Sequence, residues 1–398
     1  MLSVEDALAR LVDGLGQTEL EEVVLTEAVG RVPVERMITA AFDVPPFANS
    51  AMDGFAILAA EGAAPRRVVG ESRAGGPPAP LVETGTAVRI MTGAPVPDGA
   101  DAVVPIEEAS EQGPMVHVQV VPRAGAHVRR AGHDVGAGTA VALPDAPLSA
   151  ATIGLLAAMG RASVAVHRPP TVAILSTGDE LAAAGARLGP GQIHDANGPA
   201  LAAAVAEAGG EPMLLPPAGD DASVIEERLI AGARTADLVI VSGGVSVGQH
   251  DHVRTVIERL GSLDFWRIAV QPGKPLAFGR IGERPVVGLP GNPVSALVTF
   301  ELFVRPMIRR MLALRGDGRL RIRARVDERL GKDVARRAYL RVRVEADGPG
   351  YRAASAGGQA SSQLLPLASS NALLVVPEGL EATVPGESYE AILTGAVT

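Results

Sequence analysis

The chain has 398 residues and a formal net charge of −9, from 36 Lys and Arg against 45 Asp and Glu. This length predicts more than one domain, and 47% apolar with 20% charged residues excludes a disordered chain. The acidic balance and 3% aromatic residues argue against nucleic acid as a partner, and the absence of cysteine excludes disulfides, thiolate nucleophiles and thiolate metal sites.

The N-terminal segment SVEDALARLVDGLG, residues 3–16, places apolar residues at helical spacing after Ser3, a favourable N-cap. It is acidic and lacks the basic and apolar stretches of a secretory signal. No later apolar run approaches the ~18 residues of a membrane span. We therefore expect a short helix here, and a cytoplasmic protein without a membrane partner.

The pattern of apolar, Pro and Gly residues divides the chain into four regions, one of them in two segments. Short β-type runs broken by Pro and Gly fill 23–134 and predict an inserted β-rich domain. Helical patterns in 1–22 and 135–168 predict a discontinuous helical linker domain around it. Strands alternate with helices over 169–314, which predicts a doubly wound α/β domain with a parallel sheet covered on both faces. The pattern over 315–398 is β only, which predicts a small C-terminal β domain.

The α/β region can be divided into individual elements. Pro306 should kink the last and longest helix, because proline lacks the amide hydrogen that an interior helical position needs. The expected strands are 171–178, 211–217, 237–244, 264–270, 275–280 and 285–291, and the expected helices are 197–210, 223–236, 252–261 and 292–312.

Three loops follow strands of this region, at the edge where parallel sheets bind ligands. Gly243, Gly244 and Gly291 let backbone N–H groups approach a phosphate, and the helices that follow offer positive N-termini. Asn292 can cap the last helix, and Pro293 suits its first position. The alternative interpretation is a set of tight turns whose glycines serve only packing. The loops are STGDE at 176–180, SGGVSVGQHD at 242–251 and LPGNP at 289–293.

The sequence lacks the signatures of other nucleotide-binding sites, and it offers one incomplete signature of a serine nucleophile. There is no G-x-G-x-x-G, and the PGKP around Lys274 lacks the other residues of a P-loop. The segment GVSVG around Ser246 fits G-x-S-x-G, which raises a serine hydrolase. The only later histidines, His250 and His252, lie in the same loop, so the usual triad cannot be completed.

Four carboxylates fall at predicted strand ends or turns: Asp179, Glu180, Asp195 and Asp251. Converging oxygens without thiolates favour Mg²⁺, which binds one or two carboxylates together with substrate phosphate. The alternative interpretation is helix caps and solvated loop acids. The run His250-Asp251-His252 suggests zinc, but neighbouring positions do not face one site, so exposed histidines are the better interpretation.

Strings in the N-terminal half complete a family pattern. With the α/β loops, they make the chain resemble the molybdopterin molybdenumtransferase family, MoeA and the related E domain of gephyrin. Seven strings in family order carry the resemblance: PPFANSAMDGFA, IMTGAPVPDGADAVVPIE, ILSTGDEL, GQIHDANGPAL, VSGGVSVGQHD, QPGKPLAFG and LPGNPVSA.

The resemblance implies a four-domain subunit in an elongated homodimer, with the active site between the α/β domain of one subunit and parts of the other. It also implies the reaction: molybdate enters the dithiolene of adenylated molybdopterin with Mg²⁺ dependence, and AMP is released. Other proteins of molybdenum cofactor biosynthesis are then expected as partners.

Functional positions carry over by motif. The catalytic set that the resemblance implies is Asp53, Thr92, Arg129, Asp134, Glu180, Asp220, Asp251 and Lys274, with Asp53, Glu180 and Asp251 as the Mg²⁺ ligands. For molybdate it implies Lys274, Ser295, Arg341 and Ser361, a mixture of cations and hydroxyl donors that suits an oxyanion. The remaining substrate-binding positions are Gly243, Gly244, Ser246, Arg267, Gln271, Pro290, Gly291 and Asn292.

Two positions depart from the family. Gln271 stands where relatives commonly have lysine, and the missing charge is worth roughly 3–4 kcal/mol per unit of anion charge before desolvation, so we expect weaker molybdate binding. Arg267 keeps its charge, and His133, often Glu in relatives, is interpreted as peripheral. Gln271 favours one alternative, a pterin-binding scaffold without turnover. A second alternative, an adenylyltransferase of free molybdopterin, leaves both β domains unexplained.

Overall fold

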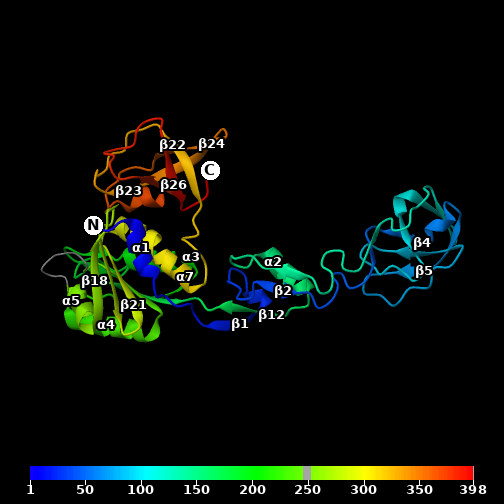
Figure 1. Cartoon of the computed structure of the whole chain (residues 1–398), viewed down its shortest axis with the longest axis horizontal. Helices are drawn as coiled ribbons and strands as arrows, with labels where there is room; N and C mark the ends of the chain where they lie inside the picture. The colour runs from blue at the N-terminus through cyan, green and yellow to red at the C-terminus, as the bar shows by residue number, and fades with distance from the viewer. Residues whose placement is uncertain (245–251, 398) are drawn as a thin grey trace. The chain divides into compact units, whose positions relative to one another are not determined.

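The structure, a computed structural model, describes residues 1–244 and 252–397 (Figure 1). The chain forms two compact units, one of Met1–Glu21 with Val166–Thr398 and one of Glu22–Ala165. This division is coarser than the four predicted domains, whose boundaries stay predictions. Within the described residues, no helix combines the length and the apolar character that crossing a membrane would require.

A six-stranded sheet forms the centre of the larger unit. Its strand order is β16-β13-β17-β21-β20-β18, and the first four are parallel, with Ile174 opposite Ile240 and Ile240 opposite Val287. The strands are β13 (Thr171–Ser176), β16 (Glu211–Leu214), β17 (Leu238–Ser242), β18 (Gly261–Arg267), β20 (Pro275–Ile281) and β21 (Arg284–Leu289).

The last two strands of this sheet correct the expectation of a wholly parallel sheet. β18 pairs antiparallel with β20, and β20 pairs antiparallel with β21. Only Gly282 and Glu283 separate β20 from β21, and a two-residue connection permits a hairpin but not a crossover. The sheet is therefore doubly wound over its four parallel strands, and the antiparallel strands β20 and β18 extend it at one edge.

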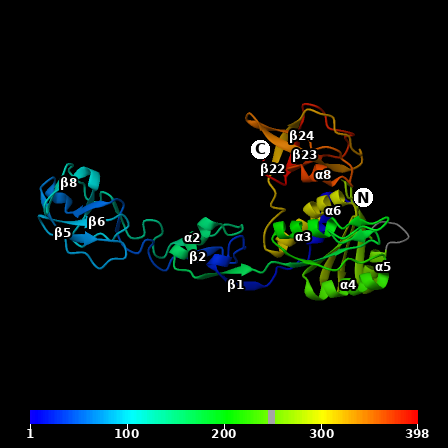
Figure 2. The same ribbon diagram turned by 180° about the vertical axis from the view of Figure 1, so that it is seen from behind.

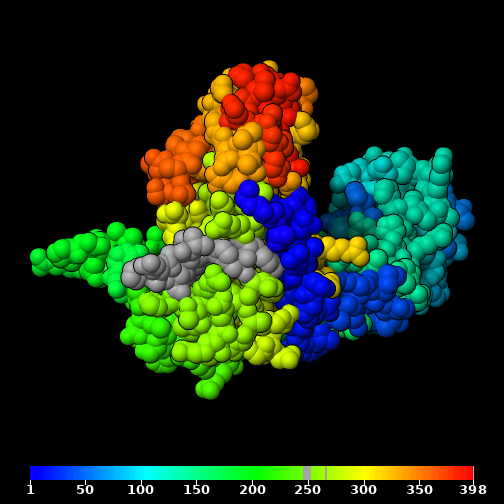
Figure 3. Space-filling model, turned by 60° about the vertical axis from the view of Figure 1, so that its left-hand side comes forward, coloured from blue at the N-terminus to red at the C-terminus, as the bar shows by residue number. Residues whose placement is uncertain are grey.

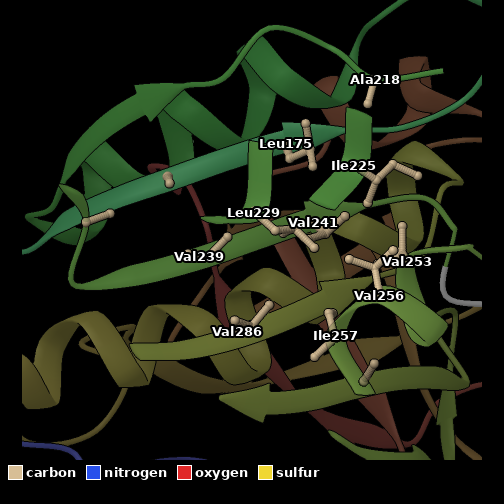
Figure 4. Packing of buried hydrophobic residues seen from close by; sticks show 13 residues of the cluster. Leu175, Ala218, Ile225, Leu229, Val239, Val241, Val253, Val256, Ile257 and Val286 are labelled. Carbon is tan, nitrogen blue, oxygen red and sulfur yellow. The ribbon is translucent and has the colours of Figure 1, made fainter. Parts of the chain in front are cut away.

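Helices cover both faces of the sheet (Figures 1 and 2). One face carries α4 (Ala222–Thr235) and α5 (His252–Leu260), and the other carries α3 (Asn197–Ala208), α6 (Pro293–Thr299) and α7 (Arg305–Met311). Figure 4 shows the core between the sheet and α4 and α5, where Leu229, Val241 and Val256 are at most 1% exposed. Truncating a leucine in such a core costs about 2–5 kcal/mol.

The expected first helix is α1 (Val4–Val12), and its N-cap Ser3 accepts a hydrogen bond from the Asp6 amide at 3.0 Å. It packs on α7 and on the turn before it, within the larger unit. Figure 3 shows the N-terminal segment (dark blue) along yellow-green residues of that unit, where Leu2 bridges to Ile268. The 135–168 part of the predicted linker domain contains the helix α2 (Ala150–Ala158), which belongs to the smaller unit.

The long helix predicted over 292–312 is interrupted. Between α6 and α7 the segment η4 (Phe300–Val304) is a π-helix, directly before Arg305 and Pro306. Pro306 has no amide hydrogen to donate into the preceding turn, so the regular ladder fails there. The predicted distortion at Pro306 thus takes the form of a π segment.

A second six-stranded sheet forms the C-terminal part of this unit, in the order β19-β23-β24-β22-β26-β25. Its edge strand β19 comes from the α/β region. The run over 264–270, expected to form one strand, is divided: β18 ends at Arg267, and Val270 begins β19. The strands are β19 (Val270–Gln271), β22 (Arg321–Val326), β23 (Arg337–Asp347), β24 (Gly350–Ser355), β25 (Ala372–Val376) and β26 (Ser388–Leu393), with the short helix α8 (Leu364–Ala368).

The smaller unit contains a third six-stranded sheet, in the order β7-β4-β6-β5-β9-β8. Its buried residues Phe55, Ile57 and Val104 form an apolar core, as the alternating runs predict. Its strands are β4 (Gly54–Ile57), β5 (Arg66–Ser72), β6 (Thr86–Ile90), β7 (Ala102–Pro105), β8 (Ala109–Gln112) and β9 (Met115–Val118). Three two-stranded ribbons join β1 (Leu20–Val24) to β12 (Ser163–His167), β2 (Met37–Thr39) to β11 (Ala140–Ala142), and β3 (Asn49–Ser50) to β10 (Val128–Arg129).

Candidate functional site

A pocket of about 770 Å³ lies at the carboxyl ends of β13, β17 and β21, where the sheet topology predicts a ligand site. It brings together eight residues of the catalytic and substrate-binding set that the resemblance implies, and it also contains residues outside that set. The predicted residues that line it are Glu180, Asp220, Gly243, Gly244, Pro290, Gly291, Asn292 and Ser295. The others include Thr177, His194, Asp195, Asn197, Ser242 and Ser362.

The loop after β13 places two carboxylates in the pocket. Gly178 has φ of +145°, and a Cβ there would lie 2.5 Å from Glu180 Oε2, so the Glu180 carboxylate lies over the bare glycine backbone. The Asp220 amide donates to Asp179 Oδ1 at 2.9 Å, which holds the Asp220 loop beside it. Asp179, a predicted metal-type acid, therefore has one oxygen committed to the backbone, while exposed Glu180 and Asp220 present theirs to the pocket.

Hydrogen bonds at the N-terminus of α3 connect the loop before this helix with the ends of β17 and β21. Asn197 Nδ2 donates to Ser242 Oγ at 2.8 Å and to the Gly291 carbonyl at 2.7 Å. Asp195 Oδ1 accepts from the amides of Asn197 and Gly198, each at 3.0 Å. Sequence reasoning assigned Asp195 only as a possible metal ligand and missed Asn197. The signal was present in the string HDAN, which directly precedes a predicted helix.

Gly243 and Gly244 are required by the turn itself. Their φ values are +98° and +61°, and a Cβ would lie 2.7 Å from the Thr177 carbonyl oxygen or 2.5 Å from Val253 Cγ2. The Gly243 amide also donates to the Leu289 carbonyl at 3.2 Å, so it is committed within the fold. Packing thus explains Gly243, whereas Gly291, which meets only the Gly243 Cα at 3.5 Å, leaves its loop free for close approach of a ligand.

The predicted oxyanion residues lie on the side of the pocket next to the C-terminal sheet. Ser295 is buried in the first turn of α6 and lines the pocket, while exposed Lys274 lies between the lining residues Gly273 and Pro275. Asn292 occupies the predicted cap position but makes no side-chain cap; its Nδ2 donates to Ser361 Oγ at 3.2 Å instead. That bond brings the C-terminal loop of Ser361 to the start of α6.

Arg341 lies behind this loop and is 1% exposed. Its guanidinium donates to the carbonyls of Gly358 and Ala360 at 3.4 and 3.3 Å, and its Nε has no partner. No carboxylate of the described chain pairs with it, and burial lowers the pKa of Arg341 to about 10. It therefore stays protonated at neutral pH, as a buried cation next to the pocket.

Arg267 and Gln271, two further predicted binding residues, are also not among the lining residues of the pocket. Arg267 is exposed at the end of β18. Gln271 is half-buried in β19, and its Oε1 accepts the Asp333 amide at 2.8 Å. The structure thus gives Gln271 a hydrogen-bonding role that the comparison with lysine did not suggest.

The smaller unit gathers the other predicted residues by loop contacts. Thr92 donates from its amide and its hydroxyl to Asp53 Oδ1, at 2.6 and 2.7 Å, and these bonds lower the pKa of the exposed Asp53 carboxyl. Arg129 lies opposite Asn49 in the β10–β3 ribbon, and the Asp134 amide donates to the Val44 carbonyl. Strings far apart in the sequence therefore meet in this unit.

The predicted metal ligands come from different parts of the chain. Asp53 and Glu180 belong to different units, and Asp251, like Ser246, lies outside the described residues. Across 1–244 and 252–397 no group of three or more His, Asp or Glu side chains is arranged to hold a metal ion.

Three family models match the chain in order. They are described as "MoeA N-terminal region (domain I and II)" at residues 2–160, "Probable molybdopterin binding domain" at 173–310 and "MoeA C-terminal region (domain IV)" at 323–394.

Known proteins resemble the chain over most of its length. Molybdopterin molybdenumtransferase 2 of Mycobacterium tuberculosis is 39% identical over 92% of this chain and 93% of its own. Gephyrin of Dictyostelium discoideum is 34% identical over 95% of this chain and 60% of its own. A solved structure of a molybdopterin biosynthesis MoeA protein from Pyrococcus horikoshii covers 100% of both chains at a TM-score of 0.82 and 31% identity. Matched in order from end to end, the chain belongs to the molybdopterin molybdenumtransferase (MoeA) family.

Proposed function

We propose that this protein inserts molybdate into adenylated molybdopterin and releases AMP. The observation that carries the proposal is the pocket beyond β13, β17 and β21, which presents two exposed carboxylates. Behind the neighbouring loop of Ser361 lies a buried arginine, Arg341, without an acidic partner in the described chain. The pocket can hold the heterocycle and pyrophosphate of an adenylated pterin, the carboxylates can hold a metal ion at the phosphates, and the arginine can attract an oxyanion bound nearby. The family to which the chain belongs supports the same reaction.

The pocket suits the adenylated pterin in size and in polarity. Its volume of about 770 Å³ falls within the range of small-molecule sites. The N-termini of α3 and α6 lie at its lining residues Asn197 and Pro293, and helix N-termini stabilise phosphate. Asn197, fixed by two hydrogen bonds, holds these loops in place for the ligand.

The oxyanion residues would hold molybdate beside the pterin. Ser295 and Ser361 offer hydroxyl donors, and Lys274 and Arg341 offer positive charge. Arg341 has no acidic partner in the described chain, so its charge is not already neutralised within the protein. An anion bound next to it would offset the cost of burying that charge.

The donors available in the pocket fit Mg²⁺. Glu180 and Asp220 supply carboxylate oxygens, and Mg²⁺ takes one or two carboxylates together with substrate phosphate. When bound, the ion would neutralise developing charge on the phosphate. Asp53 and Asp251 remain further proposed ligands on the basis of the family resemblance.

The smaller unit is proposed to contribute Asp53, Thr92, Arg129 and Asp134 to the reaction. The hydrogen bonds from Thr92 lower the pKa of the Asp53 carboxyl, and exposed Arg129 can offset phosphate charge. A homodimer and a cytoplasmic location belong to the same proposal. The almost wholly apolar helix α2, in which only Leu156 is buried, supports a partner surface.

The test is AMP release from adenylated molybdopterin by the purified protein, with Mg²⁺ present and molybdate titrated from zero. We expect release that saturates with molybdate. Tight pterin binding without release would indicate the scaffold alternative. A parallel reaction with free molybdopterin and ATP should release no pyrophosphate; pyrophosphate release would indicate the adenylyltransferase.

A further inference from the structure

Gln271 lies where two parts of the proposed oxyanion site join. It ends β19, a two-residue strand from the α/β region that forms the edge of the C-terminal sheet. In this parallel pairing Val270 is opposite Arg337 and Gln271 is opposite Ala338, and the Arg337 amide donates to the Ala269 carbonyl at 2.9 Å. The pairing involves only two residues.

The Gln271 side chain supplies a further contact. Its Oε1 accepts the Asp333 amide at 2.8 Å, in the turn that leads into β23. Asp333 in turn organises that turn, because its Oδ1 accepts the Ala335 amide at 2.9 Å and its Oδ2 accepts Arg336 Nε at 2.8 Å. The carboxamide therefore connects the edge strand to the turn that starts β23.

The two ends of this connection carry the oxyanion residues. Three residues after Gln271, the Lys274 carbonyl accepts the Ile268 amide at 3.0 Å and closes the loop. A Cβ on Gly273 would lie 2.4 Å from Thr299 Cγ2, so the loop packs directly on α6, which carries Ser295. On the other side, Arg341 follows Ala338 by three residues along β23. A shift of one residue in the pairing would move Arg341 by about 3.3 Å relative to Lys274.

We propose that Gln271 is a positioning residue of the oxyanion site, and this rests on the proposed function. By accepting the Asp333 amide it fixes the strand that carries Arg341 relative to the loop that carries Lys274. A lysine at 271 has three donors and no acceptor, so the Asp333 N–H would lose this partner. The expectation from charge alone is therefore reversed: Gln271→Lys weakens molybdate binding in spite of its added charge.

The experiment combines amide hydrogen exchange with a molybdate titration of AMP release, using the full-length protein. Gln271→Met keeps the length of the side chain and removes the acceptor, Gln271→Glu keeps an acceptor, and Gln112→Met changes an exposed glutamine of the smaller unit as a control. We expect faster exchange of the Asp333 amide in the Met and Lys variants, and protection retained in the Glu and control variants. The half-saturating molybdate concentration should rise about three- to tenfold in the Met and Lys variants, with maximal AMP release nearly unchanged.

Either of two results would overturn the proposal: tighter molybdate binding by Gln271→Lys, or an unchanged half-saturating concentration in Gln271→Met. If wild-type protein releases no AMP, the proposed function fails by itself. Calorimetric titration of molybdate into the same variants then replaces turnover, and the same two results decide the role of Gln271.

Discussion

The two units hold their candidate residues on different kinds of scaffold. In the larger unit, Glu180, Gly243 and Gly291 follow three neighbouring parallel strands, so the edge of one sheet brings them to one pocket. In the smaller unit, Asp53 and Thr92 are exposed loop residues joined by their own hydrogen bonds. A regular sheet edge thus gathers side chains through strand pairing, whereas the loop cluster depends on individual polar contacts.

This difference has an energetic consequence. In the larger unit, regular strands hold the site residues in place, so replacing Glu180 or Arg341 should change the charge of the site without unfolding the pocket. In the loop cluster, the candidate residues Asp53 and Thr92 also make the hydrogen bonds that hold the two loops together. We therefore expect the largest losses of activity from the larger unit and small, local shifts from Thr92.

The largest effect is expected for Glu180→Gln. The change removes a negative charge from the pocket while keeping the side-chain shape, so AMP release at saturating molybdate should fall about 10²–10³-fold. Single-turnover AMP release measures this, with pterin binding followed separately. The matched control is Glu211→Gln, at the opposite end of the same sheet, which should leave AMP release unchanged. Equal losses in both variants would contradict a pocket-specific role.

Arg341→Met separates function from stability. The half-saturating molybdate concentration should rise about 10²-fold because the anion loses a buried cation. The melting temperature should stay unchanged or rise, because the buried charge has no acidic partner to lose. Arg343→Met, an exposed arginine on the same strand, serves as the control. A large fall in melting temperature with unchanged molybdate binding would show that Arg341 is structural.

Gly243→Ala and Gly291→Ala test which glycine the turn requires. Gly243→Ala should destabilise the larger unit by about 1–3 kcal/mol, because its φ is +98° and the Thr177 carbonyl blocks a Cβ. Gly291→Ala should cost less than about 1 kcal/mol, since a Cβ there makes only an ordinary contact. Urea unfolding of the full-length protein, followed by circular dichroism, measures both changes. Equal destabilisation by both changes would refute the distinction.

Thr92→Val is expected to have the smallest effect. Removing the hydroxyl leaves the Thr92 amide bond in place, so the pKa of Asp53 should rise part of the way towards its ordinary value. Because the folded pKa is lowered, the stabilisation from ionised Asp53 is present above about pH 4 and is lost as the pH falls through that lower value. Carboxyl NMR titration of labelled aspartate measures the shift, with Thr92→Ser as the control that keeps it low. An unchanged pKa in Thr92→Val would contradict the hydroxyl's role.

The pocket of the larger unit was predictable because strand period and topology act together. Buried runs such as 171–176 and 238–242 end in polar, glycine-rich loops, and parallel pairing aligns those ends. The split of the run over 264–270 into β18 and β19 could not be predicted, because both halves are equally suited to a strand. Which sheet each half joins is decided by long-range pairing.

The contacts of Asn197 and Gln271 were equally beyond sequence reasoning. Each depends on a carboxamide that reaches backbone groups far away in the chain, at Gly291 and at Asp333. The Asp53–Thr92 contact joins loops without any periodic pattern, so only the family resemblance pointed to these residues.

The most direct test of the central claim is the stoichiometry of a single turnover with wild-type protein. Adenylated molybdopterin, Mg²⁺ and molybdate are mixed with the protein, and AMP and molybdenum-loaded pterin are both quantified by mass spectrometry. We predict equal amounts of the two products, each dependent on molybdate. AMP released without metal transfer to the pterin would contradict the account, because the pocket would then hydrolyse the adenylated pterin and not insert the metal.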